Sequence, residues 1–501
     1  MRIQQFLEHH GILRNPFAEE DAQTDPVFKD HCIDSTRHPT WDKVYGDPSE
    51  PSTSIVFGEK GAGKTALRLQ MDRHLAQYNQ QHPDQRLFVI QYDDFNPYLD
   101  RFRERMSKRR RRPDKMLAEW QLWDHMDAIL ALGVTQLVDR VLDVPRLGTH
   151  AGQPIGPELL GQLDRHQCRD LLLLAACYDQ STAEPFKTRW WRLRRRLRFW
   201  PVKANLDLGL GLAASAAIAG GVIYLAAWGP REWIARWWLW TAILLAAWLP
   251  RLWRAIRCWR LARGIVRRMR VVPRQVHPLR QLLLNLTPGE LAGQPLPNKE
   301  RTEDRYELLG KLQGVLQRLG HTGIVVLVDR VDEPYLINGS AEMMRALLWP
   351  MLDNKFLKHP GMGLKMMLPI ELSRFIERES RDFYQRARLD KQNMVPTLQW
   401  SGEALFDVAN ARLAACAENG AAPTLRELFD EAVTEQRLIE ALRTLRVPRH
   451  MFKFMYRLLV AHCNAHTDHD PVWKISAATF ESVLALYARD QNAMELGLGA
   501  G

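Results

Sequence analysis

The feature that most constrains the fold of this 501-residue chain is a glycine-rich segment between an apolar stretch and a helical pattern. Residues 55–57 are apolar and predict a short buried strand, and the next eight residues read GEKGAGKT. Apolar residues at helical spacing follow from Ala66 onward. Glycines allow the backbone to curl so that its N–H groups converge, and the helix that follows adds its dipole at the same point. A strand–loop–helix unit that binds phosphate is therefore predicted here.

The residue types in this loop indicate a nucleotide complexed with magnesium. Lys64 offers a point charge to the β- and γ-phosphates, and the Thr65 hydroxyl is a ligand for Mg²⁺. We therefore expect ATP and Mg²⁺ as cofactors, with Lys64 also taking part in catalysis. The expected nucleotide-binding residues of the loop are Gly58, Gly61, Ala62, Gly63, Lys64, Thr65 and Ala66.

Hydrolysis of such a nucleotide needs a carboxylate at a strand end to hold the metal ion. Residues 324–328 are five consecutive apolar residues, which predicts a buried parallel strand. Asp329 follows at the carboxyl end, where ligands bind in open α/β sheets. Asp332 and Glu333 come next and are the candidates to position the attacking water.

A second strand with acids at its end lies closer to the loop in the sequence. Asp93 and Asp94 follow the apolar residues 87–90. This apolar run is shorter, and aromatic residues rather than a third acid come after it. We therefore rank Asp329 first as the magnesium ligand and expect residues 87–90 to form a neighbouring core strand.

Two apolar runs lie in the long interval between the glycine-rich loop and the preferred acid. Residues 208–228 carry no charge, and about 20 apolar residues are enough for a helix to cross the hydrocarbon core of a membrane. The second run, residues 237–249, reaches a spanning length only if it extends back to Trp233 across Arg236. The polar residues 229–232 would turn the chain between the two runs.

Basic and small residues favour a membrane location for these runs. The formal net charge is +11, and both flanks are rich in arginine, which the positive-inside rule places in the cytoplasm. Small residues recur at Gly211, Ser215 and Ala219, a spacing that lets helices pack closely in lipid. We predict a transmembrane helical hairpin over residues 204–250, in contact with lipid of the cell inner membrane, with the nucleotide-binding domain in the cytoplasm. A hairpin buried in a soluble core is the alternative.

A basic run at residues 108–112 (KRRRR) leaves nucleic-acid contact open as another use of the positive charge. We expect the run to be a solvated loop, followed by a helical stretch over residues 115–142 whose apolar stripe faces the core. The six cysteines are far apart and form no CxxC pair, which argues against structural zinc and favours reduced thiols.

Residues that follow Asp329 supply candidates for sensing the nucleotide. Residues 363–372 predict the next core strand, interrupted near its end by Pro369, with Glu371 as the candidate to sense the γ-phosphate. Arg386 or Arg388 could reach the nucleotide of a neighbouring subunit as an arginine finger, or belong to a solvated helix end.

The chain is helical in character from Ser401 onward, which predicts a C-terminal helical lid. Arg449 directly follows Pro448 at a predicted helix start, where it can contact phosphate or act as a surface cap. The segments predicted along the chain are an N-terminal segment (1–50), the first part of the nucleotide-binding core (51–104), a helical insertion (105–203), the hairpin (204–250), a helical return and linker (251–300), the second part of the core (301–400) and the lid (401–501).

These motifs resemble those of the AAA+-like and signal-transducing (STAND) P-loop NTPases. The spelling VVLVDRVDE is similar to the NACHT form of the acidic motif, with Arg330 where a small residue is usual. The step from Pro448 to Arg449 resembles the second sensor of origin-recognition-type ATPases. The inserted apolar runs resemble the KAP NTPases in placement, without the two adjacent aspartates usual there.

The resemblance implies an α/β fold in which a P-loop NTPase parallel sheet carries a helical insertion, a transmembrane helical hairpin and a C-terminal helical lid. It implies that Asp329 is the Walker B acid and that Arg449 binds nucleotide as sensor 2. It further implies a homo-oligomer, and many prokaryotic members of these families act in defence against phage.

Three functions follow as expectations. The first is a membrane-anchored ATPase that couples ATP binding and hydrolysis to assembly or signalling, together with a partner effector or sensor protein. The second is a nucleotide-dependent switch or scaffold that does not hydrolyse ATP. The third is a soluble ATPase that processes nucleic acid.

Overall fold

The chain divides into two compact units in the computed structural model. Unit 1 combines Met1–Gln81, Val325–Arg345 and Leu352–Gly501, and unit 2 combines His82–Ile324 and Ala346–Met351. The structure describes residues 1–145, 154–200, 203–228, 237–418 and 423–495. Unit 2 is thus almost entirely an insertion between the first and second parts of unit 1 in the sequence.

Unit 1 is a mixed α/β unit built from both ends of the chain. Its strands are β1 (Ser54–Gly58), β4 (Met362–Pro369), β5 (Asn393–Val395) and the second half of β3 (His321–Val328), which begins in unit 2. Its helices are α1 (Ile3–His9), α2 (Trp41–Tyr45), α3 (Lys64–Gln81), α16 (Ala341–Leu348, ending in unit 2), α17 (Asn354–Leu357), α18 (Glu371–Glu377), α19 (Arg381–Ala387), α20 (Gly402–Cys416), α21 (Glu435–Leu445), α22 (Pro448–Ala465) and α23 (Ala477–Glu495). The strands predicted at residues 55–57 and 324–328 are confirmed.

The strands form one sheet in the order β2-β3-β4-β1-β5. β1 is parallel to β4 on one side and to β5 on the other, with Val56 opposite Met367 and Val395. All five residues of β1 are buried, as expected of a parallel strand covered on both faces. The strand predicted over residues 363–372 stops at Pro369, opposite Gly58, so its predicted continuation to residue 372 is wrong. A strand end tolerates the missing N–H of proline.

Unit 2 is mostly helical. The stretch predicted as one helix over residues 115–142 is two helices, because Gln121 has extended backbone geometry and caps the first turn of the second helix together with Asp124. The basic run is exposed as predicted, and its first residues form a short 3-10 turn. The elements are β2 (Arg86–Tyr92), α4 (Asn96–Arg105), η2 (Lys108–Arg110), α5 (Pro113–Leu117), α6 (Leu122–Leu142), α7 (Pro157–Gly161), α8 (Arg165–Tyr178), α9 (Phe186–Arg196), η3 (Lys203–Asn205), α10 (Leu206–Trp228), α12 (Trp237–Arg268), α13 (Val276–Leu283), α14 (Pro288–Leu291) and α15 (Thr302–Arg318).

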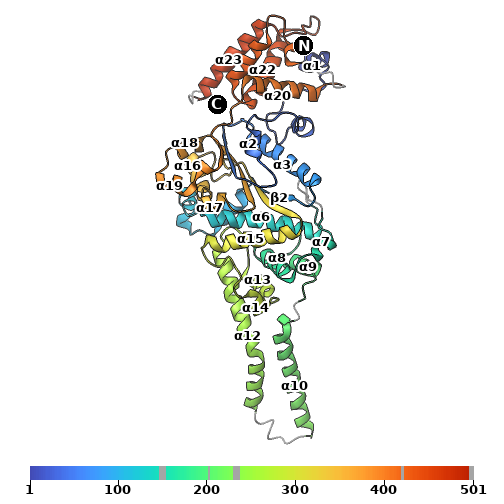
Figure 1. The fold of residues 1–501 in the computed structure, drawn as a ribbon, viewed down its shortest axis with the longest axis vertical. Helices are drawn as coiled ribbons and strands as arrows, with labels where there is room; N and C mark the ends of the chain where they lie inside the picture. Colours follow the sequence, from blue (N-terminus) through green and yellow to red (C-terminus); the bar gives the residue numbers. More distant parts are fainter. Residues whose placement is uncertain (146–153, 201–202, 229–236, 419–422, 496–501) are drawn as a thin grey trace. The chain divides into compact units, whose positions relative to one another are not determined.

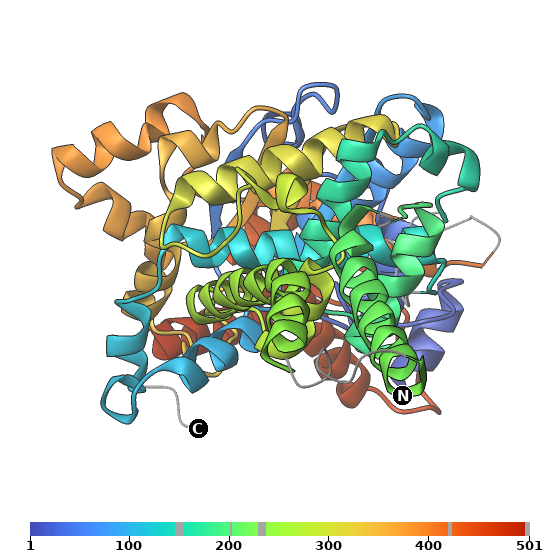
Figure 2. The same ribbon diagram turned by 90° about the horizontal axis from the view of Figure 1, so that it is seen from below.

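Two long helices of unit 2, α10 and α12, lie side by side (Figures 1 and 2). By length and composition, α10 is the one candidate membrane-spanning helix among the residues that the structure describes. Its apolar side chains are exposed, and Leu210, Ile223 and Tyr224 each leave about two thirds of their surface uncovered (66%, 69% and 66%). So large an exposed apolar surface is typical of a helix that contacts lipid or a partner.

α12 is longer than the predicted second half of the hairpin, which was expected to end at residue 250. It continues through Pro250 to Arg268, and its later turns pack into unit 2 through the buried side chains of Cys258, Ala262 and Ile265. The predicted turn at residues 229–232 and the extension across Arg236 to Trp233 lie outside the described residues.

Small residues of α10 receive a tryptophan of α12. A Cβ atom added at Gly211 would lie 2.9 Å from Cε2 of Trp248, so only glycine leaves room for the indole ring. The indole Nε1 donates a hydrogen bond to Ser215 Oγ at 3.1 Å, and this hydroxyl donates to the Gly211 carbonyl at 2.8 Å. Two members of the predicted small-residue row therefore face the second helix, whereas Ala219 is exposed.

Buried ion pairs join α6 to its neighbours in unit 2. Arg305 of α15 and Asp127 of α6 are fully buried and approach to 3.1 Å, and the Tyr178 hydroxyl donates to the same carboxylate at 2.7 Å. Arg189 bridges Asp139 and Asp179 in a second buried cluster. Such pairs are stabilising only while both partners are present, because either charge alone would be buried without compensation.

We predict that Arg305→Met destabilises the protein by about 3–5 kcal/mol, because it leaves Asp127 charged and buried without its cation. Urea unfolding of the full chain in detergent measures the loss. Arg443→Met is the matched control, because Arg443 is 62% exposed and pairs with an exposed Glu403. This change should lower stability by less than about 1 kcal/mol. Equal effects of the two substitutions would contradict the prediction.

Candidate functional site

The glycine-rich loop joins the end of β1 to the start of α3 within unit 1. β1 ends at Gly58, and α3 begins at Lys64, two residues before the helical pattern read in the sequence from Ala66. Gly61 and Gly63 have φ values of +91° and +89°, which other residues adopt only with strain. The Lys64 ammonium donates to the carbonyls of Gly58 at 2.8 Å and Glu59 at 2.9 Å. The Lys64 ammonium is therefore held by carbonyl groups of the loop, close to the N-terminus of α3.

The C-terminal helical part of unit 1 rests on this loop. The Arg449 amide donates to the Gly61 carbonyl at 3.4 Å, and a Cβ atom added at Gly61 would lie 2.6 Å from Cβ of Arg449. The Trp400 indole donates to the Ala62 carbonyl at 2.9 Å. Arg449 is the second residue of α22, so the predicted helix start places it directly over the loop.

Asp329 follows the last residue of β3 and reaches the first turn of α3. Its side chain is 2% exposed, and the Thr65 hydroxyl hydrogen-bonds to it. Arg68, one turn further along α3, places Nε 3.2 Å from Asp329 Oδ2. Burial raises the pKa of Asp329, while Arg68 and the Thr65 hydrogen bond oppose the increase. The predicted pair of Thr65 and Asp329 is thus brought together at one point.

The two acids after Asp329 lie in a tight turn. Arg330 has a φ of +59°, a left-handed conformation that explains why a small residue suits this position. The turn brings Arg330 Nε within 3.4 Å of Glu333 Oε1. Burial and the neighbouring Asp332 and Asp329 raise the pKa of Glu333, against the effect of Arg330.

Three acids raise the pKa of Lys64 against the effect of its burial. Burial lowers the pKa of Lys64, and Asp332, Asp329 and Glu371 oppose this decrease. Glu371 therefore contributes to the field at Lys64, although it is not among the residues that line the pocket.

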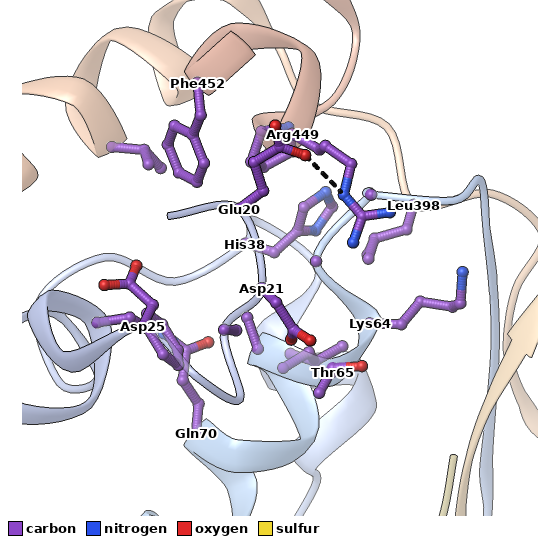
Figure 3. Close-up of a pocket in the computed structure, with 18 of the residues that line it drawn as sticks. Glu20, Asp21, Asp25, His38, Lys64, Thr65, Gln70, Leu398, Arg449 and Phe452 are labelled. Atoms are coloured by element: carbon purple, nitrogen blue, oxygen red, sulfur yellow. Dashed lines mark ion pairs between the residues drawn. The ribbon is translucent and has the colours of Figure 1, made fainter. Parts of the chain in front are cut away.

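A pocket that is open to solvent lies between the loop, the acidic turn, the lid and the N-terminal segment of unit 1. Figure 3 shows Lys64 and Thr65 on one side of it and Arg449 and Phe452 on the other. The predicted site residues on its surface are Gly61, Gly63, Lys64, Thr65, Ala66, Asp329, Asp332, Glu333 and Arg449. Residues that are far apart in the sequence thus share one cavity.

The N-terminal segment contributes residues that the sequence motifs do not reveal. Glu20 pairs with Arg449 at 3.8 Å and with Lys453 at 3.4 Å, and a dashed line in Figure 3 marks the first of these pairs. Asp21 and His38 also line the pocket, and burial lowers the pKa of His38. The acidic run around Glu20 is the only signal in the sequence for this part of the site, and it fits no motif.

Other candidates lie away from the pocket or in unit 2. Arg386 is exposed on α19, and Arg388 pairs with Asp390 at 3.5 Å; neither lines the pocket. Asp93 and Asp94 follow β2 in unit 2, where Asp94 accepts a hydrogen bond from the Asn96 amide at 3.0 Å at the start of α4. Arg386 and Arg388 therefore lie outside this pocket.

The donor set of the pocket fits a magnesium ion bound together with phosphate. Among the described residues no group of three or more His, Cys, Asp or Glu side chains is arranged to hold a metal ion by itself. The Thr65 hydroxyl and the Asp329 carboxylate supply two hard oxygen ligands, and Mg²⁺ commonly takes the remainder from substrate phosphates and water. Oδ2 of Asp329 is buried and accepts no hydrogen bond within the described residues, which marks it as the oxygen that such an ion would use.

We predict that Gly61→Ala lowers nucleotide affinity at least about tenfold, because the new Cβ would meet Arg449 and the positive φ disfavours alanine. Equilibrium binding of a fluorescent ATP analogue measures this loss. Gly310→Ala, in the middle of α15 with open space around it, is the control and should leave affinity unchanged. If Gly61→Ala binds nucleotide as tightly as wild type, the close contact between Gly61 and Arg449 is not needed for binding.

Comparison of this chain with protein-family models, with curated proteins and with solved structures finds no match. Evidence about its function therefore comes from the residues and distances of the pocket in unit 1.

Proposed function

We propose that this chain is a membrane-anchored P-loop ATPase that binds ATP and Mg²⁺ in the pocket of unit 1. The observation that carries the proposal is the contact between Thr65, at the end of a loop of sequence G-x-x-x-x-G-K-T, and the buried Asp329 at the end of β3. A phosphate-binding loop paired with a strand-end carboxylate is the arrangement that in-line phosphoryl transfer requires.

Each residue of the pocket has a role in this proposal. Lys64 exchanges its two carbonyl acceptors for phosphate oxygens, and the loop N–H groups bind the same phosphates. Thr65 and Asp329 would hold Mg²⁺, which when bound would supply positive charge to offset the negative charge of the phosphates. Glu333, with its raised pKa, accepts a proton from the attacking water, and Asp332 helps to orient that water.

The lid supplies the switch between nucleotide states. Arg449 pairs with Glu20 over the loop, and a bound phosphate competes with Glu20 for this guanidinium. Loss or gain of that phosphate then changes how α22 sits on Gly61. The position of Arg449 over the loop supports the resemblance to AAA+-like and STAND NTPases. That resemblance, rather than any residue of the pocket, implies a role in assembly or signalling with a partner effector or sensor protein, and in defence against phage.

Exposed arginines support an oligomer as part of the same proposal. Arg386 and Arg388 lie on the surface of unit 1 and do not line its own pocket. In a homo-oligomer either side chain can serve as an arginine finger for the nucleotide of the next subunit.

The candidate spanning helix supports the membrane part of the proposal. α10 is apolar and mostly exposed, and arginine is frequent both in the segment that precedes α10 and in the second half of α12. With both arginine-rich segments in the cytoplasm, the ATPase unit faces the cytoplasm from the inner membrane, as in the placement of helices in KAP NTPases.

One contact favours a second candidate, a switch that binds ATP without hydrolysing it. The Arg330 guanidinium lies 3.4 Å from the Glu333 carboxylate, and a carboxylate engaged in this way is a weaker base for water. Turnover of ATP decides between the two candidates.

We predict that Glu333→Gln lowers ATP turnover at least about 100-fold while ATP binding is kept, because only the proton acceptor is removed. Lys64→Ala should abolish binding itself. Turnover by wild-type protein should also fall when the pH is lowered, because protonation of Glu333 removes the base. Since the pKa of Glu333 is raised, this fall should begin at a pH higher than for an ordinary glutamate, whose pKa is 4.5.

Phosphate release by the full chain in detergent measures this turnover. Glu377→Gln, an exposed change on α18, is the control and should retain wild-type turnover. Tight ATP binding without turnover in wild-type protein would favour the switch, and unchanged turnover in Glu333→Gln would exclude Glu333 as the base.

We also predict that the protein stays in the membrane pellet after alkaline carbonate extraction. Ala217→Arg, near the middle of α10, should release a large part of it, because a central arginine costs about 2.5–3.5 kcal/mol of insertion free energy. Ala217→Leu is the matched control and should remain in the pellet. A wild-type protein that is fully soluble would eliminate the membrane anchor, and DNA binding with a steep salt dependence would then favour the nucleic-acid-processing ATPase.

A further inference from the structure

An arginine lies where the pocket would receive its metal ion. Arg68 belongs to α3, one turn after Lys64, and its side chain is 2% exposed. Its Nε atom lies 3.2 Å from Oδ2 of Asp329, whose side chain is also almost fully buried. The guanidinium is therefore within ion-pair distance of the carboxylate that fits Mg²⁺.

The two sides of the Asp329 carboxylate have different partners. The Thr65 hydroxyl hydrogen-bonds to this carboxylate. Oδ2 accepts no hydrogen bond within the described part of the chain, so its close neighbour there is the charge of Arg68. A carboxylate oxygen that accepts no hydrogen bond is free to coordinate a metal ion. In Asp329, however, the positive charge of Arg68 already lies next to that oxygen.

Charge balance makes metal binding conditional on nucleotide. A divalent cation that enters beside Asp329 alone meets two positive charges, those of Arg68 and Lys64, in a buried place where repulsion is weakly screened. The triphosphate of ATP brings several negative charges to the same point and offsets this repulsion. A metal ion would therefore arrive with nucleotide rather than before it.

We propose that Arg68 is a positioning residue that guards the metal-binding oxygen of Asp329, so that a divalent cation binds there only together with nucleotide. This inference rests on the proposed function, because it takes Asp329 as a ligand of the metal ion. Arg68 also orients the carboxylate of Asp329 through their ion pair. A merely structural ion pair would stabilise α3 against β3 without any effect on metal affinity.

Binding of Mn²⁺, followed by electron paramagnetic resonance on the full chain in detergent, separates these roles without any measurement of activity. In the absence of nucleotide, we expect Arg68→Gln to bind one Mn²⁺ at least about tenfold more tightly than wild type. Asp329→Asn in the Arg68→Gln background should abolish this gain, which locates the new site. Arg73→Gln on the same helix is the matched control, because Arg73 is 54% exposed and pairs with Asp34 at 3.8 Å outside the pocket.

Two results would overturn the inference. One is wild-type protein that binds Mn²⁺ without nucleotide as tightly as the variant does. The other is a folded Arg68→Gln protein, judged by circular dichroism, that gains no affinity for Mn²⁺.

If Arg68→Gln does not fold, wild-type protein alone still tests the inference. Its affinity for Mn²⁺ should rise at least about tenfold when a non-hydrolysable ATP analogue is bound, and equal affinities would overturn the inference. The double change Arg68→Met with Asp329→Leu removes both charges and should restore folding without any Mn²⁺ site.

Failure of the inference and failure of the proposed function give different results. If wild-type protein hydrolyses ATP but Arg68→Gln gains no affinity for Mn²⁺, the proposed ATPase function stands and the proposed role of Arg68 is wrong. If Arg68→Gln gains affinity for Mn²⁺, Asp329→Asn abolishes that gain and the protein does not bind ATP, the proposed role of Arg68 stands and the proposed ATPase function is wrong.

Discussion

The contact between the Thr65 hydroxyl and the Asp329 carboxylate is the constraint on which the pocket depends. The two residues are separated in the sequence by nearly all of unit 2, yet each follows the carboxyl end of a strand in the same sheet. Strand order, rather than proximity in the chain, therefore assembles the site. The lid and the N-terminal segment contribute further pocket residues at the edge of the sheet where the strands end.

Local patterns in the sequence were sufficient for β1, for β3 and for the start of α22. Each depends on short-range features: a run of buried residues, glycines with positive φ, or a proline at the first helical position. They did not predict the pairing of Arg68 with Asp329 or the entry of Glu20 into the pocket. Those contacts join distant segments, and an arginine in a helix or an acid in a loop has the same local pattern with or without a partner.

Secondary structure differed from prediction where tertiary packing or capping decided the outcome. The break before α6 comes from reciprocal capping by Gln121 and Asp124, which a periodic apolar stripe does not reveal. α12 continues beyond residue 250 because the turns after Pro250 bury Cys258 and Ala262 in unit 2. Both cases show that apolar periodicity locates a helix more reliably than it locates the ends of that helix.

The continuity of α12 has a mechanical consequence. A helix of 32 residues is about 48 Å long at 1.5 Å per residue, so one continuous rod links the apolar turns beside α10 to the buried turns within unit 2. A small tilt of the buried end becomes a larger sideways displacement at the far end, as in any lever. Pro250, which interrupts the hydrogen-bond ladder of the rod, is the point at which such a lever can bend.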